Sequence, residues 1–129
     1  MTFPDDCRYT KEHEWVRLDA DGLVTVGVTD YAQQELGDVV FVELQPVGTR
    51  LDAEAPFGTV EAVKTVSELF APVAGTVEAV NDALDGAPEQ VNADPYGAGW
   101  MVKLRPNDPA DVDGLLSVED YKHLIGADA

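Results

Sequence analysis

Lys64 is the residue of this chain whose type and surroundings best suit chemistry. No other lysine lies between Lys11 and Lys103, although this interval is rich in Asp and Glu. An ordinary lysine carries a strongly hydrated ammonium and becomes a nucleophile only where desolvation or a nearby cation favours the neutral amine. Glu61 and Glu68 favour the charged form instead. The sequence therefore indicates a lysine presented to a modifying enzyme more than a catalytic one.

A repeated hexapeptide brackets this lysine. Residues 58–63 and 75–80 both read Gly-Thr-Val-Glu-Ala-Val. In each copy the apolar Val and Ala alternate with Thr and Glu, which is the period of a strand with one buried face. The repeat predicts a pseudo-symmetric sandwich or barrel, built from two similar halves, with Lys64 at the tip of a hairpin at one end.

Turn residues and helix signals mark the other elements that must position this hairpin. Thr29 or Asp30 is suited to cap a short helix that Gly37 ends, and Ser117 with Asp120 forms a weak capping box. By residue number, the expected elements are a hairpin of 9–18 with 23–28, a helix to 36, strands at 38–44, within 51–80 and at 100–104, a loop at 81–99 with a helical turn near 88–91, and helices after 109.

The chain is expected to form one domain over residues 1–129. Its first eight residues read as a loose N-terminus, and residues 110–126 as a C-terminal helical tail packed on the strands. The predicted fold class is therefore mostly β, with a short helix after the first hairpin and helices at the C-terminal end.

Composition excludes several classes of function. The formal net charge is −17 and the predicted pI about 4.1, which opposes binding to nucleic acid or to anionic membrane surfaces. Cys7 is the single cysteine, so no intrachain disulfide forms, and His13 and His123 lack zinc-ligand spacing. No apolar run spans a bilayer and no signal peptide is recognisable. The chain is expected to be cytoplasmic, although a mitochondrial matrix protein without its transit peptide would look similar.

Two other groupings are discounted as active sites. Glu12, His13 and Glu14 resemble part of an acid–base site, but no nucleophilic Ser or Cys pattern accompanies them, which favours a surface or loop role for the histidine. The glycines of residues 96–99 follow no strand and open no helix, so they do not form a phosphate loop. The lack of a convincing active site favours a carrier or binding module over an enzyme.

Several motifs together resemble the H-protein family of the glycine cleavage system, a family of free-standing lipoyl carriers. The resemblance covers nearly the whole length of the chain. The motifs are His-Glu-Trp-Val at 13–16, Val-Gly-Val-Thr-Asp-Tyr-Ala-Gln at 26–33, Leu-Gly-Asp-Val-Val-Phe-Val-Glu-Leu at 36–44, Val-Glu-Ala-Val-Lys at 60–64, Ala-Pro-Val-Ala-Gly at 71–75, and Val-Asn-x-Asp-Pro-Tyr-Gly-x-Gly-Trp at 91–100.

The resemblance implies a lipoyl/biotinyl-type flattened β-barrel or sandwich, the barrel-sandwich hybrid, in which Lys64 carries lipoate in amide linkage. It also implies that Glu61, Gly75 and Gly48, which stand three before, eleven after and sixteen before the lysine, help lipoate-attaching enzymes to recognise the hairpin. A physical reason for the glycines is that they permit backbone turns closed to residues with a Cβ.

The partners implied by the resemblance are three enzymes. A pyridoxal-phosphate glycine decarboxylase transfers the aminomethyl group of glycine to the arm, a tetrahydrofolate-dependent aminomethyltransferase takes the carbon and releases ammonia, and dihydrolipoyl dehydrogenase reoxidises the dithiol. The chain would be their shared substrate and not a catalyst. Between these enzymes the family shelters the loaded arm in a cleft, where Glu14, Glu68 and Glu12 are the candidate partners of its ammonium.

Alternatives remain open at this stage. A biotin carrier usually has methionines beside its lysine, and a lipoyl domain of a 2-oxoacid dehydrogenase usually has Asp before it, whereas Val63 and Thr65 flank Lys64 here. A lipoyl or octanoyl relay to other carriers would use the same lysine. An unmodified interaction protein is the structural alternative, and an independent enzyme is the weakest.

Overall fold

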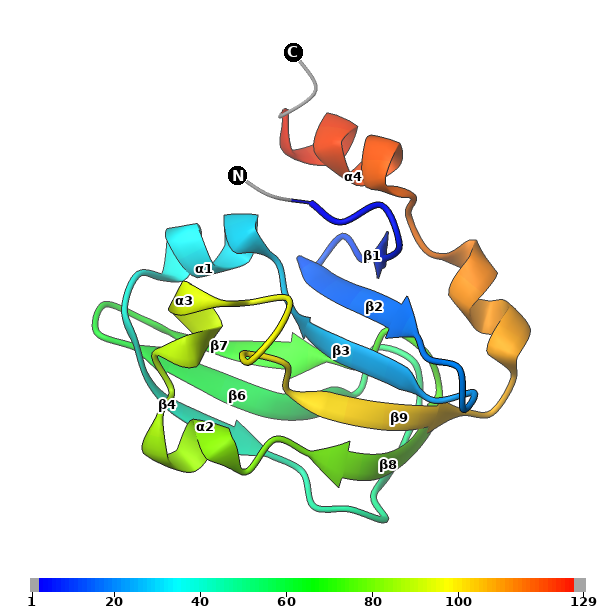
Figure 1. Ribbon diagram of the computed structural model, residues 1–129, viewed down its shortest axis with the longest axis horizontal. Helices are drawn as coiled ribbons and strands as arrows, with labels where there is room; N and C mark the ends of the chain where they lie inside the picture. The colour runs from blue at the N-terminus through cyan, green and yellow to red at the C-terminus, as the bar shows by residue number, and fades with distance from the viewer. Residues whose placement is uncertain (1–2, 127–129) are drawn as a thin grey trace.

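The computed structural model describes residues 3–126, most of whose regular structure is β-strand (Figure 1). Over these residues one antiparallel sheet has the order β1-β2-β3-β9-β8-β5 and a second the order β4-β6-β7. The first consists of β1 (Arg8–Tyr9), β2 (Glu14–Leu18), β3 (Val24–Val28), β9 (Val102–Pro106), β8 (Gly75–Val80) and β5 (Arg50–Leu51); the second of β4 (Val39–Leu44), β6 (Pro56–Ala62) and β7 (Val66–Phe70). The layered, unclosed arrangement confirms the predicted flattened sandwich.

The main core lies between the two sheets. Val24 and Val26 of β3 pair with Leu104 and Val102 of β9, and all four side chains are fully buried. Val60 of β6, from the other sheet, belongs to the same core. The valines of β3 therefore join the sheets through aliphatic side chains, although Thr25, which alternates with them, is buried as well.

The two copies of the hexapeptide lie in different sheets, as β6 and β8. The first residue of each copy must be glycine for the same steric reason. A Cβ on Gly58 would lie 2.5 Å from the carbonyl oxygen of Glu43, and one on Gly75 would lie 2.5 Å from that of Arg105. Each glycine therefore lets a neighbouring strand come close, which supports the predicted likeness of the two halves.

The predicted first helix and capping box are confirmed. Helix α1 (Asp30–Leu36) begins after Thr29, whose side chain accepts from the backbone N–H of Ala32, and Gly37 ends it. Near the C-terminal end, Ser117 caps α4 (Val118–Ile125) by accepting from the N–H of Asp120, after the 3-10 helix η1 (Pro109–Gly114). No helix over residues 3–126 is both long and apolar enough to cross a membrane.

The segment 81–99, expected to be mainly loop, contains two short helices. These are α2 (Ala83–Gly86) and α3 (Gln90–Ala93). Asn92 of α3 accepts from the N–H of Val39 and donates to the carbonyl of Gly37. Helix α3 is therefore held by residues more than 50 positions away in the sequence. The expected strand at 100–104 begins later, at Val102, because Asn81 donates to the carbonyl of Trp100 and takes it out of the ladder.

The N-terminal stretch expected to be loose is packed. Cys7 is buried, and the hydroxyl of Tyr9 donates to the carbonyl of Pro4 at 2.6 Å. The ring of Tyr9 stacks on that of Tyr121 with centroids 4.8 Å apart, and Phe3 meets both rings edge-on. Residues 1 and 2 lie outside the described residues. Sequence analysis missed this packing because helix α4, which supplies it, is more than 100 residues away.

Candidate functional site

Lys64 lies on the turn that joins β6 to β7, where the sequence places it. The backbone N–H of Ala62 donates to the carbonyl of Thr65 at 2.8 Å, which closes the turn around Val63 and Lys64. The N–H of Val63 donates to the carbonyl of Asp38 at 3.0 Å and fixes the turn against the start of β4. Lys64 is exposed, so its amine is open to a partner while the backbone beneath it is fixed.

The stem of Lys64 lies over Gly37, at the end of helix α1. A Cβ on Gly37 would lie 3.3 Å from Cε and 3.7 Å from Nζ of the lysine. Gly37 also has φ +78° and ψ −157°, a conformation almost restricted to glycine. Sequence analysis treated Gly37 only as a helix stop, but in the fold it also leaves the space that the lysine stem occupies.

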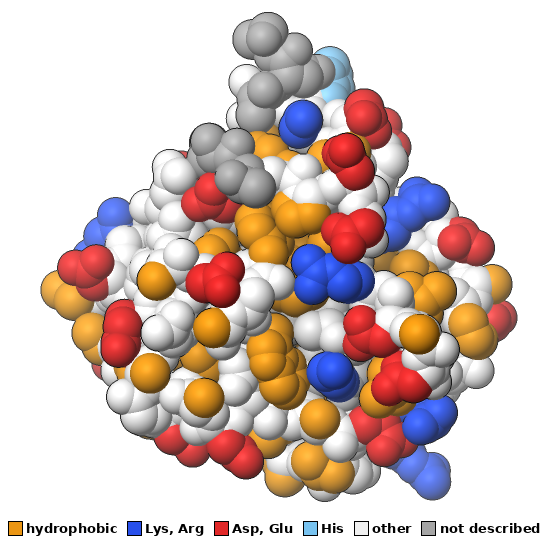
Figure 2. Space-filling model, in the orientation of Figure 1, with side chains coloured by type: hydrophobic (Ala, Val, Ile, Leu, Met, Phe, Trp, Pro, Cys, Tyr) orange, Lys and Arg blue, Asp and Glu red, His pale blue; other side chains and the backbone are white. Residues whose placement is uncertain are grey.

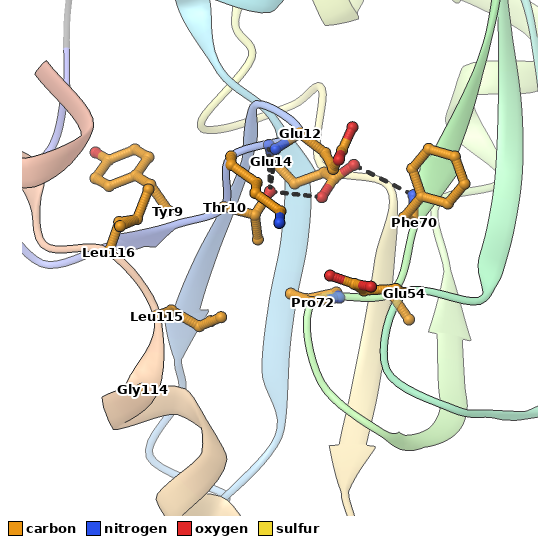
Figure 3. Close-up of a pocket in the computed structure, with 12 residues that line it drawn as sticks. Tyr9, Thr10, Glu12, Glu14, Glu54, Phe70, Pro72, Gly114, Leu115 and Leu116 are labelled. Carbon is orange, nitrogen blue, oxygen red and sulfur yellow. Dashed lines mark hydrogen bonds between the residues drawn. The ribbon is translucent and has the colours of Figure 1, made fainter. Parts of the chain in front are cut away.

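Two hollows share the loop before β2. The first, which we call the hairpin hollow, has a volume of about 170 Å³ and lies between α1, β7 and the loop before β2. The second, which we call the inner hollow, has a volume of about 230 Å³ and lies between that loop, β7 and the segment after η1 (Figure 3). Glu12 lines both, so the hollows adjoin.

The structure brings the predicted acids together only in part. Glu12 and Glu68 line the hairpin hollow, and Glu12 and Glu14 line the inner hollow. Glu14 and Glu68 therefore share no hollow, although Phe70, two residues beyond Glu68 on β7, donates its N–H to Glu14. The three carboxylates therefore do not form a single cluster.

Glu14 is the chemically unusual acid of the site. Its side chain is 1% exposed. One carboxylate oxygen accepts from the hydroxyl of Thr10 at 2.7 Å and the other from the N–H of Phe70 at 3.2 Å, as Figure 3 shows. Burial raises the pKa of Glu14 to about 7, against the lowering effect of these two hydrogen bonds. Glu14 therefore changes charge close to neutral pH.

His13 has a structural role within the loop that carries these acids. Its Nδ1 lies 2.9 Å from the hydroxyl of Tyr121, which lies 2.8 Å from the hydroxyl of Thr29. Burial lowers the pKa of His13, so the neutral ring is favoured at neutral pH. The loop is thereby attached to α4 and to the capping residue of α1, which refines the expected surface or loop role.

Glu54 is a site residue that sequence analysis missed. Its φ is +70°, a value that non-glycine residues rarely adopt. Its backbone is held there because its N–H donates to the carbonyl of Ala71 at 2.7 Å. The side chain lines the inner hollow, and Figure 3 shows its carboxylate among the residues around that hollow, on the same side of Pro72 as Glu14. As one acid among 25 Asp and Glu residues, it carried no sequence signal.

The three predicted recognition residues lie at two ends of the molecule. Glu61 is exposed on the hairpin, beside Lys64. Gly48, whose φ is +93°, donates its N–H to the carbonyl of Val77, and Gly75 pairs with Leu51. Gly48 follows β4, whose last residue Leu44 pairs with Gly58 of β6, and Gly58 is six residues or roughly 20 Å along the strand from Lys64. Their part in recognition stays a prediction.

The expected reason for Gly75 is wrong. It does not occupy a positive-φ turn; a Cβ there would collide with the backbone of β9. We therefore expect Gly75→Ala to lower the free energy of unfolding by roughly 2–3 kcal/mol and the Tm by on the order of 10 °C. Gly86→Ala, where a Cβ meets nothing within 4 Å, is the matched control. Equal thermal unfolding midpoints for the two variants would refute the steric explanation.

Comparison with known proteins gives consistent results. A family model described as Glycine cleavage H-protein matches residues 7–128. Proteins named glycine cleavage system H protein are 61% identical over 127 residues in Chlorobium limicola and 59% identical over 126 residues in Chlorobium phaeobacteroides strain BS1, each alignment covering 98% of this chain and 99% of the relative.

A solved structure agrees with the sequence matches. The crystal structure of a glycine cleavage system H protein from Mycobacterium marinum superimposes with a TM-score of 0.88 at 40% identity, covering 96% of this chain and 99% of that one. The family match begins at Cys7 and includes both α4 and the hairpin that carries Lys64. With sequence and fold in agreement over nearly its full length, the chain belongs to the glycine cleavage H-protein family.

Proposed function

We propose that this chain is the lipoyl carrier of a glycine cleavage system, with lipoate in amide linkage on Nζ of Lys64. The observation that carries the proposal is the position of Lys64: it is exposed on a fixed turn, and its stem crosses Gly37 beside the hairpin hollow. Leu36, the neighbour of Gly37, lines that hollow. A lipoyl arm attached to Lys64 would therefore begin beside the hairpin hollow, which can shelter it from solvent.

The residues present fit such an arm. Both hollows combine aliphatic or aromatic walls with carboxylates, which suits an apolar chain that carries a polar cargo at its end. The walls include Leu36, Val60 and Leu69 in the hairpin hollow and Phe70 and Leu115 in the inner hollow. When attached, lipoate supplies a dithiolane that takes up the aminomethyl group of glycine and the accompanying electrons.

Glu14 is proposed to hold the primary ammonium of this cargo. A partly desolvated ammonium requires an anionic partner, and Glu14 is a buried carboxylate fixed by two hydrogen bonds. Glu54 also lines the inner hollow and offers a second carboxylate. Glu12 and Glu68 line the way from the hairpin and attract the same cation over a longer range.

The chain's own part in the cycle is to present, shelter and release the cargo and not to catalyse. Its proposed partners are glycine decarboxylase, aminomethyltransferase and dihydrolipoyl dehydrogenase, in the cytoplasm. A net charge of −17 keeps the carrier soluble and steers it toward basic partner surfaces. Screening by salt is expected to slow these encounters.

Mass spectrometry of the protein isolated from its own cells tests the proposal. We expect a lipoyl-sized increment on the peptide that contains Lys64, and glycine-dependent decarboxylation when the protein is combined with glycine decarboxylase. A biotin-sized increment would assign the chain to carboxyl transfer instead. An unmodified Lys64 in cells that make lipoate would refute the carrier function and favour an interaction protein.

A further inference from the structure

A second hydrophobic core lies beneath α4, apart from the core between the two sheets. Its buried members are Cys7, Tyr9, Trp15, Val118 and Tyr121. Figure 2 shows hydrophobic side chains gathered where α4 meets the strands below it. The start of α4 is also tied to β1, because the backbones of Tyr9 and Leu116 each donate an N–H to the carbonyl of the other at 2.9 Å. Helix α4 is therefore fastened to the strands by side chains and by the backbone.

The hydroxyl of Tyr121 is a polar group within this core. The side chain is fully buried, and its oxygen lies 2.9 Å from Nδ1 of His13 and 2.8 Å from the hydroxyl of Thr29. Burial raises the pKa of Tyr121 to about 12, against the lowering effect of the bond with Thr29, so the hydroxyl stays protonated at neutral pH. Whichever of these groups donates, one oxygen atom of α4 joins two separate segments of the chain.

The first segment is the turn of residues 10–14 between β1 and β2. It carries the acids on either side of His13, and we call it the acid turn. The φ of His13 is +70°, a strained value that persists only where other contacts hold it. The N–H of His13 donates to the carbonyl of Thr10 at 3.1 Å, and its carbonyl accepts from the N–H of Thr29 at 3.0 Å. These bonds hold the backbone, and Tyr121 holds the ring.

The second segment is the start of α1. Thr29 is fully buried and caps this helix by accepting from the N–H of Ala32, so its hydroxyl is held in place. His13 from the acid turn and Leu36 from α1 both line the hairpin hollow. The hydroxyl of Tyr121 therefore connects two walls of that hollow, although α4 itself lines neither the hollow nor the hairpin.

We propose that the hydroxyl of Tyr121 is a positioning group of the cargo site, which holds the acid turn against α1 so that Glu14 stays where it binds the ammonium. The bond from the N–H of Phe70 to Glu14 is 3.2 Å long, at the upper end for such bonds, so a small shift of the acid turn breaks it. Tyr121 acts through Glu14 and touches no cargo. This inference rests on the proposed lipoyl carrier function and on Glu14 as the partner of the ammonium.

The test compares the rates at which the lipoylated, aminomethyl-loaded proteins lose ammonia at pH 8. We expect Tyr121→Phe, which keeps the ring and removes the hydroxyl, to lose ammonia roughly tenfold faster than the parent, because the acid turn loses a hydrogen bond. His13→Asn removes the same link from the other side and should have a similar effect, because asparagine, like histidine, tolerates a positive φ. Agreement between the two variants identifies the link itself.

Tyr9→Phe is the matched control. Tyr9 is as deeply buried as Tyr121, the two rings stack, and the hydroxyl of Tyr9 donates to the carbonyl of Pro4 at 2.6 Å. Figure 3 shows this hydroxyl on the side of the ring away from Glu14. Both phenylalanine variants should lower the Tm by similar amounts, whereas only Tyr121→Phe should lose ammonia faster.

A double variant shows whether Tyr121 acts through Glu14. Tyr121→Phe combined with Glu14→Gln should lose ammonia at a rate within about twofold of Glu14→Gln alone, because the acid turn then has no carboxylate at this position to hold. Two independent roles would instead multiply the separate effects of the single variants.

The outcomes separate this inference from the proposed function. Ammonia loss from Tyr121→Phe at the parent rate, equal acceleration in Tyr121→Phe and Tyr9→Phe, or multiplied effects in the double variant would each overturn the inference and leave the carrier function standing. A parent that glycine decarboxylase cannot load with the aminomethyl group would overturn the carrier function, and this inference with it.

Discussion

Replacing Lys64 by arginine is expected to abolish carrier function while leaving the fold intact. Arginine keeps the positive charge and the length of the side chain, but its guanidinium stays protonated and cannot be acylated. Because Lys64 is exposed at the turn, the Tm should stay within about 2 °C of the parent. Glycine-dependent decarboxylation in the reconstituted system should fall at least a thousandfold, to the rate measured without carrier.

Intact mass measured beside the activity makes this result specific. Lys64→Arg should show no lipoyl-sized increment, whereas Lys122→Arg, on α4, should be modified and active like the parent. Persistent activity of Lys64→Arg, or an increment mapped to another lysine, would contradict the assignment of the site.

Local sequence signals predicted the elements around the lysine. Thr29 and Gly37 delimit α1 because capping depends on a few neighbouring residues, and the alternation at Val60 and Ala62 places β6 with one face in the core. A hairpin between β6 and β7 follows from the same short-range rules. Lys64 was therefore located from sequence with no knowledge of the rest of the fold.

Tertiary contacts, which local sequence signals do not reveal, determine which acidic residues belong to the site. Glu14 differs from the exposed acids only because Thr10 and the N–H of Phe70 hold it in a buried position, and Phe70 is 56 residues away. Glu54 lines the same hollow because Ala71 holds its backbone at a positive φ. Since acids are so common in this chain, residue type alone could not separate these two from the solvated majority.

Gly37 shows the same limit in another form. Its role as a helix stop is readable from sequence, but the contact with Lys64 depends on how the turn of one sheet meets the end of α1. One residue thus satisfies a local rule and a long-range one. Only the local rule leaves a pattern that can be recognised along the chain.

Glu14→Gln is expected to change both the stability of the protein and the protection of its cargo, with opposite signs. The pKa of Glu14 is about 7 in the folded state, against an ordinary value of 4.5 for glutamate. Because this pKa is raised, protonated Glu14 makes its full contribution to the free energy of unfolding below about pH 4.5. That contribution is lost as the pH rises through about 7. The loss amounts to about 3 kcal/mol, as an order of magnitude.

Glutamine keeps the shape of the side chain and removes this titration. Compared with the parent, Glu14→Gln should therefore unfold with a similar free energy at pH 4.5, because protonated Glu14, like the amide, offers one donating group and one accepting oxygen to Thr10 and Phe70. At pH 8 it should be the more stable protein, by up to about 3 kcal/mol. Urea unfolding at the two pH values measures the difference. Glu89→Gln, at an exposed position, should follow the parent at both.

Binding of the ammonium cargo requires ionised Glu14, which is the form that burial disfavours. Only ionised Glu14 neutralises the ammonium, so loss of ammonia from the loaded parent should slow as the pH rises through about 7. Glu14→Gln should release ammonia roughly ten- to a hundredfold faster at pH 8, with no inflection near pH 7, while Glu89→Gln keeps the parent profile. Equal protection in parent and Glu14→Gln would exclude Glu14 as the partner of the ammonium. If Glu14→Gln were more stable at pH 8 but released ammonia no faster, the burial of Glu14 would destabilise the protein without protecting the cargo.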